Sequence, residues 1–183
     1  HLPGDDWDMD FTNDRTLVSS EIRPTAATAK WFNPKIKAGE KRNVVLAVGE
    51  PGGVFALDRH TGEFLWANPW PYDVPNFILN GIDAKGITHI NDKLIFTGPN
   101  QRHEICFFNT RSYWSTAYSP KTNSLYVPFV DACLDMRTGA EGSRPRRDGV
   151  VRDPNKPDEL SGVSKINVAT GKIEHIFKGP API

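Results

Sequence analysis

The segment that decides the fold runs from Ala56 to Trp66 and reads ALDRHTGEFLW, which has the form A-x-D-x-x-T-G-x-x-x-W. An Asp at the end of a strand can close a turn by accepting backbone N–H groups, and a Gly after it supplies the left-handed position that reverses the chain. A Trp four residues after Gly62 can lie flat between neighbouring sheets. The segment therefore predicts a strand-turn-strand unit that packs against another sheet.

Weaker copies of this turn follow over 117–123, 133–139 and 165–171. Their turn residues are Ser119, Thr122 and Asn123; Asp135, Thr138 and Gly139; and Asn167, Thr170 and Gly171. Helical periodicity is nearly absent, so the chain is predicted to be all-β, and the recurring units indicate blades of a β-propeller. At about 45 residues per blade, residues 1–183 form one partial propeller of about three to four blades.

Short runs rich in β-branched or aromatic residues, separated by turn signals, predict the strands. They are Thr16 to Ile22, Asn43 to Val48, Gly53 to Leu57, Lys93 to Thr97, Ser124 to Phe129, Gly162 to Asn167 and Lys172 to Phe177. Two long segments, 67–87 and 137–161, are Pro-rich or carry mixed charges, and we expect them to be loops on the outside of the blades.

Charge and composition exclude several classes of function. The chain has 22 basic and 22 acidic side chains, so it lacks the basic surplus of a nucleic-acid-binding protein. No run of 18 apolar residues is present, so no membrane span is expected. Its five histidines are scattered, which argues against zinc or haem ligation. The sequence contains no G-x-S-x-G, P-loop or Rossmann fingerprint, which argues against a serine hydrolase, a nucleotide hydrolase and a nicotinamide-dependent enzyme.

Cys106 and Cys133 are the two cysteines of the chain. Their number and spacing exclude a zinc knuckle. Two alternatives remain on composition: one disulfide in an exported protein, or two buried thiols.

An acidic cluster occupies residues 3–10, which read PGDDWDMD. Four carboxylates in six positions repel one another unless solvent or a cation offsets their charge. In an extended chain, side chains two residues apart point the same way, so Asp8 and Asp10 can reach one hard cation. An EF-hand loop is excluded because Phe11 and Leu17 stand where it requires Gly and Glu. A solvated acidic turn is the alternative.

Three blocks together resemble the quinoprotein alcohol dehydrogenases of the methanol and ethanol dehydrogenase type, which depend on pyrroloquinoline quinone (PQQ). The blocks are PGDDWDMD at 3–10, VVLAVGEPGGVFALDRHTGEFLWANPW at 44–70 and CFFNTRSYWSTAYSPKTNSLYVP at 106–128. The resemblance covers residues 1–136 and implies a periplasmic or secreted eight-bladed propeller. Such an enzyme oxidises alcohols to aldehydes, passes hydride to PQQ beside a Ca²⁺ or lanthanide ion, and delivers electrons to a cytochrome c. Eight blades need about twice this length, so we expect a fragment that packs with the remaining blades and is inactive alone.

The resemblance also implies roles for residues of the acidic cluster. Asp8 matches the catalytic base, which takes the hydroxyl proton of the alcohol and also contacts the metal. Asp10 matches the additional carboxylate of the lanthanide-using branch, where a trivalent ion favours one more anionic oxygen.

Further positions follow from the same resemblance. Trp114 matches a Trp near the cofactor, and Cys106 and Cys133 match a family disulfide. Trp66 matches the tryptophan-docking motif that ties adjacent blades. Glu50 occupies a cofactor-contacting position that usually holds Arg or Lys, which inverts the charge there.

Two other functions remain open on the sequence. A quinoprotein-like propeller could act as a non-catalytic binding or assembly scaffold, which Glu50 permits, as does Tyr113 in place of a family Asn. A four-bladed ring that binds carbohydrate through exposed Trp side chains is the weaker alternative.

Overall fold

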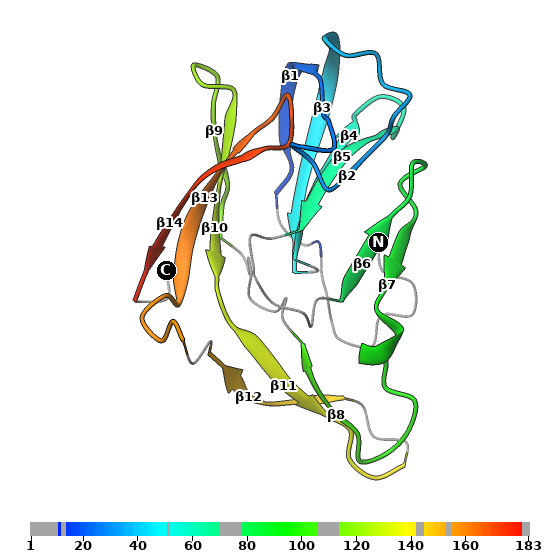
Figure 1. Ribbon diagram of the computed structural model, residues 1–183, viewed down its shortest axis with the longest axis vertical. Helices are drawn as coiled ribbons and strands as arrows, with labels where there is room; N and C mark the ends of the chain where they lie inside the picture. The colour runs from blue at the N-terminus through cyan, green and yellow to red at the C-terminus, as the bar shows by residue number, and fades with distance from the viewer. Residues whose placement is uncertain are drawn as a thin grey trace.

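The computed structural model describes residues 11, 14–50, 52–69, 78–105, 114–141, 145–152 and 155–180. These residues form four antiparallel β-sheets and one short 3₁₀ turn, which confirms the all-β prediction. Figure 1 shows two larger sheets, one led by β3 and the other by β10, with two smaller sheets beneath and beside them. None of the helical turns in the described segments is long and apolar enough to cross a membrane.

The first large sheet has the strand order β1-β3-β4-β5-β2. Its strands are β1 (Thr16–Ile22), β2 (Trp31–Phe32), β3 (Glu40–Gly49), β4 (Gly53–Asp58) and β5 (Phe64–Pro69). Buried and exposed side chains alternate along β1, as expected for a strand with one face against the core. The predicted strands over 16–22, 43–48 and 53–57 are therefore confirmed, with β3 longer than expected.

The second large sheet has the order β14-β13-β10-β9. Its strands are β9 (Ala117–Ser119), β10 (Ser124–Val130), β13 (Ser161–Asn167) and β14 (Ile173–Gly179). Asn123, between β9 and β10, has a φ of 48°, so Asn takes the left-handed position predicted for this copy of the turn. The predicted strands over 124–129, 162–167 and 172–177 are confirmed within one or two residues.

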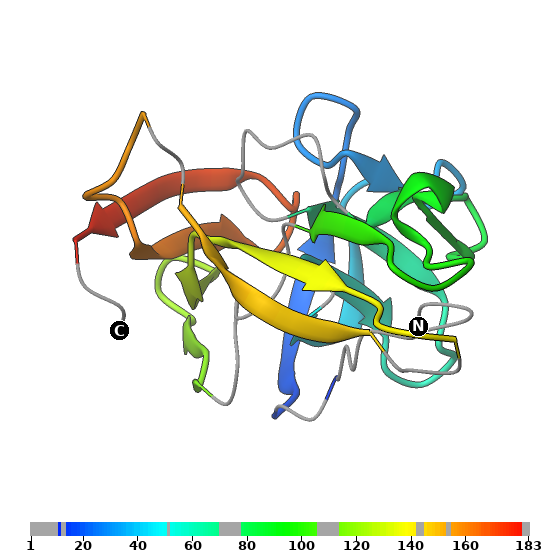
Figure 2. The same ribbon diagram turned by 90° about the horizontal axis from the view of Figure 1, so that it is seen from below.

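The two smaller sheets lie partly inside segments that were expected to be loops. They consist of β6 (Leu79–Ile82) with β7 (Thr88–Ile90), and of β8 (Arg102–Ile105), β11 (Cys133–Arg137) and β12 (Arg146–Val151). The loop prediction was thus wrong for 67–69, where β5 ends, and for 79–82 in the first segment, and for 146–151 in the second. The charged sequence of β12 is compatible with a strand because β12 is an exposed edge strand, whose ladder partner β11 supplies the backbone hydrogen bonds. Figure 2 shows these strands running along the underside of the molecule.

The predicted strand over 93–97 is also wrong. Asp92–Leu94 forms a 3₁₀ turn, η1, that Asn91 caps by accepting the backbone N–H of Lys93 at 3.2 Å. A capping side chain offers the backbone a local partner, and this competes with strand pairing.

The turn over 58–62, within the segment Ala56 to Trp66, has the predicted geometry. The Asp58 carboxylate accepts the backbone N–H groups of His60 and Thr61 at 2.9 and 3.0 Å, and Gly62 has a φ of 74°. The copy at the other large sheet is closed in the same way, because Asn167 accepts the N–H of Thr170 at 3.2 Å and Gly171 has a φ of 77°. Both turns thus follow the sequence prediction.

The copy over 133–139 does not form this turn. Asp135 lies in the middle of β11, and its carboxylate accepts from Arg102 of β8, with 2.7 Å from the Arg102 Nε. An arginine across the strand pair draws the carboxylate away from its own backbone, so β11 continues to Arg137. The arginine pairing also lowers the pKa of Asp135 below its ordinary value, against a smaller raising effect of burial.

The positive charge of Arg42, on β3, stabilises the turn over 58–62. It lies 3.3 Å from a carboxylate oxygen of Asp58 and 3.1 Å from oxygens of Glu40 and Glu63. Burial by itself raises the pKa of Asp58, but the hydrogen bonds from His60, Thr61 and Arg42 outweigh it and place that pKa below its ordinary value.

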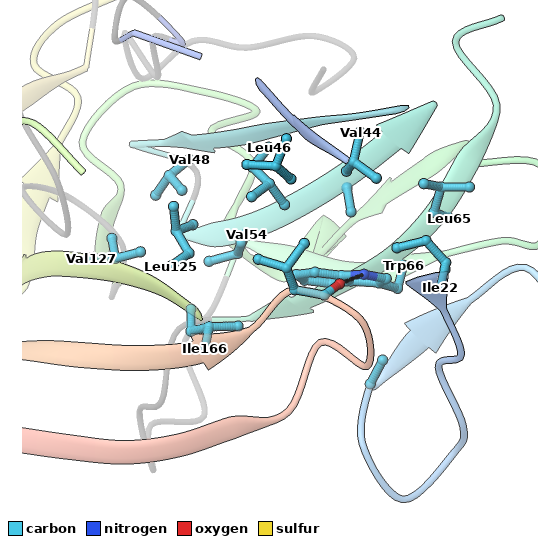
Figure 3. Packing of buried hydrophobic residues seen from close by; sticks show 14 of the residues in the cluster. Ile22, Val44, Leu46, Val48, Val54, Leu65, Trp66, Leu125, Val127 and Ile166 are labelled. Carbon is cyan, nitrogen blue, oxygen red and sulfur yellow. Dashed lines mark hydrogen bonds between the residues drawn. The ribbon is translucent and has the colours of Figure 1, made fainter. Parts of the chain in front are cut away.

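The main hydrophobic core fills the space between the two large sheets. Its members include Ile22, Val44, Leu46, Val54 and Trp66 from the first sheet and Leu125, Val127, Phe129 and Ile166 from the second. Figure 3 shows Trp66 in this cluster together with Val44 and Val54 of the first sheet and Ile166 of the second. The ring is fully buried, and its Nε1 donates to the carbonyl oxygen of Val168 at 3.0 Å. The predicted position of Trp66 between neighbouring sheets is confirmed.

Polar groups also join the two large sheets, and sequence patterns did not predict the role of Asn68 among them. Asn68 is two residues after Trp66 and 7% exposed. Its amide nitrogen donates to the carbonyl oxygen of Gly171 at 2.6 Å and to that of Thr28 at 3.1 Å. Arg23 donates its backbone N–H to Ala169 at 2.7 Å. The 167–171 turn of the second sheet is thus held by the first sheet through several backbone groups.

A second core joins the small sheets to the other face of β5. It contains Phe64, Ile78, Leu79, Ile105, Leu134 and Met136, among others. Phe64 and Ala67 pack into this core, whereas Leu65 and Trp66 pack into the main one. Two successive residues face the main core because the pairing of β5 with β4 shifts register at this point.

Candidate functional site

The residues that the sequence singles out divide between described and undescribed parts of the chain. Asp8, Asp10 and Cys106 lie outside the described residues. Glu50, Trp114 and Cys133 are described. Within the described ranges, no group of three or more His, Cys, Asp or Glu side chains could hold a metal ion. The carboxylates of residues 3–10, whose hard oxygen donors suit Ca²⁺ or a lanthanide, lie outside the described residues.

Glu50 lies directly after β3, in the turn that leads to β4. The turn is closed by Gly52, which has a φ of 79° and donates its N–H to Gly49 at 3.3 Å. The Glu50 side chain is 8% exposed. The position that the resemblance gives to Arg or Lys is thus occupied by a nearly buried glutamate.

Phe11 is the first described residue after the acidic cluster, and it packs on this same turn. Its ring lies against Gly49: a Cβ on that glycine would stand 2.6 Å from Phe11 Cδ1. The ring also makes an edge-on contact with Phe55 of β4, with 5.6 Å between the centroids. The chain that leaves the acidic cluster is therefore attached to the 49–53 turn, which also contains Glu50.

Trp114 is half-buried and lies at the same end of the first sheet. Two residues later, the Thr116 hydroxyl is 2.9 Å from the hydroxyl of Thr16, the first residue of β1. Thr16 pairs with Leu46, and β3 continues from there to Gly49. Strand register therefore places Trp114, Phe11 and Glu50 at one end of this sheet.

Cys133 begins β11 and is 9% exposed. It lies at the junction where the chain passes from β10 of the second large sheet into the small β8-β11-β12 sheet, which Figure 1 shows as one long bent path.

Sequence reasoning did not single out Phe11 as a site residue and used it only to exclude an EF-hand. The available signal was an aromatic residue directly after a run of carboxylates, combined with a later Gly in the GEPGG turn that leaves room for a ring.

Several solved structures share this fold. A europium-containing methanol dehydrogenase aligns with a TM-score of 0.72 and 19% identity, over 98% of this chain and 30% of that one. Quinohemoprotein alcohol dehydrogenases from Pseudomonas putida and Comamonas testosteroni align with TM-scores of 0.67 and 0.58, at 18% and 16% identity. The two alignments cover 26% and 32% of these enzymes and 96% and 99% of this chain. The fold is thus that of quinoprotein propeller enzymes.

Sequence comparison leads to the same class. XoxF of Paracoccus denitrificans, named as a dehydrogenase, is 27% identical over 144 residues, which are 73% of this chain and 21% of the relative. The dehydrogenase subunit of the quinone alcohol dehydrogenase of Acetobacter aceti is 27% identical over 119 residues, or 60% of this chain and 15% of the relative. No family model matches the chain.

These findings confirm the resemblance to PQQ-dependent alcohol and methanol dehydrogenases. The chain spans about a fifth of the length of the curated relatives that it matches.

Proposed function

We propose that this chain is part of a PQQ-dependent alcohol dehydrogenase that oxidises alcohols to aldehydes and delivers electrons to a cytochrome c. The observation that carries the proposal is the agreement of sequence and fold with dehydrogenases of this class, including a TM-score of 0.72 to a methanol dehydrogenase. The confirmed packing of Trp66 on the 167–171 turn supports it, because this motif was expected from the same resemblance.

In this proposal residues 1–183 contribute three to four blades of an eight-bladed ring, and the remaining blades are its packing partners. The open sheets of the described structure are compatible with a partial ring. Intact mass and peptide mapping of the protein as isolated test this part: a parent chain or complex of about twice this length or more is expected.

Asp8 acts as the catalytic base and, with Asp10, as a metal ligand. Its carboxylate receives the hydroxyl proton of the alcohol, and a cation held by both carboxylates keeps Asp8 ionised. PQQ, when bound, supplies the hydride acceptor, and Ca²⁺ or a lanthanide polarises it. In this proposal Trp114 stacks on the planar cofactor, and its position two residues before Thr116, whose hydroxyl lies 2.9 Å from that of Thr16 at the end of the first sheet, supports this role.

The Cys106 and Cys133 side chains form a disulfide, which requires a periplasmic or secreted location. This part is supported by Cys133, which carries no free thiol in the structure. Alkylation of the unfolded protein should label neither cysteine before reduction and both after it.

The experiment for the activity uses the isolated protein, reconstituted with PQQ and either Ca²⁺ or La³⁺, in a dye-linked assay with primary alcohols. Asp8→Asn should lower kcat by about 10²- to 10⁴-fold, because a general base contributes that much. Asp158→Asn, an exposed carboxylate outside the candidate site, is the matched control and should leave kcat unchanged. Unaltered kcat in Asp8→Asn would remove Asp8 from the mechanism.

A non-catalytic scaffold is the alternative, and one observation favours it: the nearly buried carboxylate of Glu50 where the resemblance leads us to expect a cation. In that case the isolated protein shows no quinone absorbance, binds no metal and is inactive after reconstitution.

A further inference from the structure

The chain contains a single Asn-Gly pair, which is formed by Asn80 and Gly81 of β6. In such a pair the backbone nitrogen of the glycine can attack the side-chain amide carbon of the asparagine, because glycine has no Cβ to obstruct the approach and rotates freely. β6 pairs with β7 alone, in the hairpin that Figure 1 shows beside the first large sheet. A two-stranded ladder is marginally stable by itself, so it opens locally at low cost.

Asn80 occupies a β-bulge. The pairing of β6 with β7 shifts register between Leu79 and Gly81, so Asn80 has no opposite residue in the ladder. Leu79 and Ile82 are both buried in the second core although two residues separate them, whereas Asn80 is exposed. A bulge accounts for both observations, because its extra residue is left unpaired and the ladder is locally disrupted. The backbone at Asn80 is therefore not held by strand pairing.

Both reacting groups are accessible. The Asn80 side chain is exposed, and no hydrogen bond to its amide is found within the described part of the chain. A Cβ added at Gly81 would lie 3.9 Å from the nearest atoms beyond its chain neighbours, which belong to His89. The described residues therefore do not shield this peptide unit from attack or from water.

Asn123 offers a comparison within the same chain, because it also precedes a small residue, Ser124. Its side-chain oxygen accepts from the Tyr118 hydroxyl at 2.9 Å, and its side-chain nitrogen donates to the hydroxyl of Ser20 at 2.7 Å. Ser124 is fully buried. An amide held at both ends must break these hydrogen bonds before it turns toward the next backbone nitrogen, so Asn123 is protected where Asn80 is not.

We propose that Asn80 is a site of spontaneous deamidation, which replaces its amide by aspartate or isoaspartate as the protein ages. The Gly81 nitrogen loses its proton to solvent and bonds to Cγ of Asn80, and the Cγ–Nδ2 bond breaks. The departing nitrogen takes up a proton from solvent and leaves as ammonia. Water then cleaves one of the two C–N bonds of the resulting succinimide ring. Cleavage at Cγ gives aspartate, and cleavage at the main-chain carbonyl carbon gives isoaspartate.

Isoaspartate changes the packing of the hairpin, because its main chain passes through Cβ and Cγ and is longer than that of an ordinary residue. The extra length separates Leu79 from Ile82, whose side chains share the second core. A strand whose register shifts turns side chains away from the face they were on. The hairpin turn also lies against Phe64, since a Cβ at Gly86 would stand 2.8 Å from Phe64 Cβ. Deamidation thus loosens the cover of the second core.

The first test incubates the isolated protein in mildly alkaline buffer and follows Asn80 by peptide mapping with mass spectrometry. The peptide that contains Asn80 should gain the mass difference between an amide and a carboxyl group, while Asn123 keeps its amide. Gly81→Ala should slow the conversion several-fold, because a methyl group obstructs the attacking nitrogen; it fits the fold, since no positive φ and no close contact are involved. Gly149→Ala, at another exposed strand position with open space around it, is the matched control and should convert like the wild type.

The second test separates the longer main chain from the added charge. Asn80→Asp carries the charge on an ordinary main chain, and its Tm should stay close to that of fresh wild-type protein because the side chain is exposed. Aged wild-type protein, enriched in isoaspartate, should melt several degrees lower than Asn80→Asp. Equal Tm values would show that isoaspartate does not disturb the second core.

A synthetic peptide with the sequence of residues 78–88 makes the proposal falsifiable without any variant. If the peptide converts while the folded protein keeps its Asn80 amide under the same conditions, the bulge protects this site and the proposal is wrong. Equal rates in the wild type and Gly81→Ala would contradict attack by the backbone nitrogen. Neither result depends on the proposed dehydrogenase function.

Discussion

Trp66 and Val168 are separated by 102 residues of chain, and a hydrogen bond of 3.0 Å from the indole nitrogen to the carbonyl oxygen joins the two large sheets. The relationship shows how a local sequence motif acts over a long range. The strand-turn-strand unit places the ring on one sheet, and a second copy of the turn offers the carbonyl oxygen on the other.

Replacing Trp66 by Phe should destabilise the fold by about 1 to 3 kcal/mol, since Phe fills part of the space but leaves the buried Val168 carbonyl without its donor. Urea unfolding followed by circular dichroism measures the loss. Phe177→Leu serves as the control, because Phe177 is 64% exposed and should cost little. Equal effects of the two changes would contradict the structural role of the seam.

Gly171→Ala should be more damaging than Gly62→Ala, although both glycines occupy the same position of the same turn. Both have a positive φ, 77° and 74°, so the left-handed conformation of an alanine at either site lowers the free energy of unfolding by about 1 to 2 kcal/mol. At Gly171 the new methyl group would also stand 2.9 Å from the Trp66 ring, whereas nothing lies within 4 Å at Gly62. Overpacking adds about 1 to 3 kcal/mol.

The difference between the two glycine variants isolates the Trp66 contact. Indistinguishable free energies of unfolding would show that the ring can move aside, and the close approach would then have no energetic importance.

Asp58 should make stability depend on pH in the acidic range. Its pKa in the folded state lies below the ordinary value of 3.8, so its contribution is complete above that value. The contribution is lost as the pH falls through the lower folded-state pKa. Asp58→Asn should therefore be less stable than the wild type at neutral pH, by about 1.5 to 3 kcal/mol, and the difference should shrink below pH 3.8. Urea midpoints recorded from pH 7 downward check both statements.

Asp10→Ala should reduce activity supported by La³⁺ more than activity supported by Ca²⁺, because the trivalent ion gains more from an additional anionic oxygen. The ratio of the two activities of the reconstituted protein is the measurement, since a general loss of folding lowers both. If lanthanide-supported activity were unchanged, the role assigned to Asp10 would be wrong.

The sequence predicted best where local chemistry and long-range packing agree. Thr16–Ile22 contains the β-branched residues Thr16, Val18 and Ile22, and its strand was predicted with its observed bounds. The Asp58 turn was predicted because the carboxylate finds its partners two and three residues away.

Prediction failed where a distant partner decides the local structure. Asp135 has the same turn pattern, yet Arg102, 33 residues away in sequence, binds its carboxylate and keeps it in a strand. Asn68 gave no sequence signal because its partners, Thr28 and Gly171, belong to different parts of the chain. β12 is a strand because it pairs with β11. Its own charged residues are not typical of a strand, so it was not predicted.

The contact between the two large sheets joins two different surfaces. The first sheet contributes the protruding Trp66 ring, and the second contributes the 167–171 turn on which this ring packs. The first sheet has a receiving turn of its own at Gly62, beside which the described structure leaves open space, and the second sheet has exposed His175 where a ring would protrude. Contacts of this head-to-tail kind can be repeated in only one rotational direction. Their repetition either closes into a ring or leaves one unpaired surface of each kind, one at each end. The direction of the contact between these two sheets is therefore set by a single glycine and a single indole.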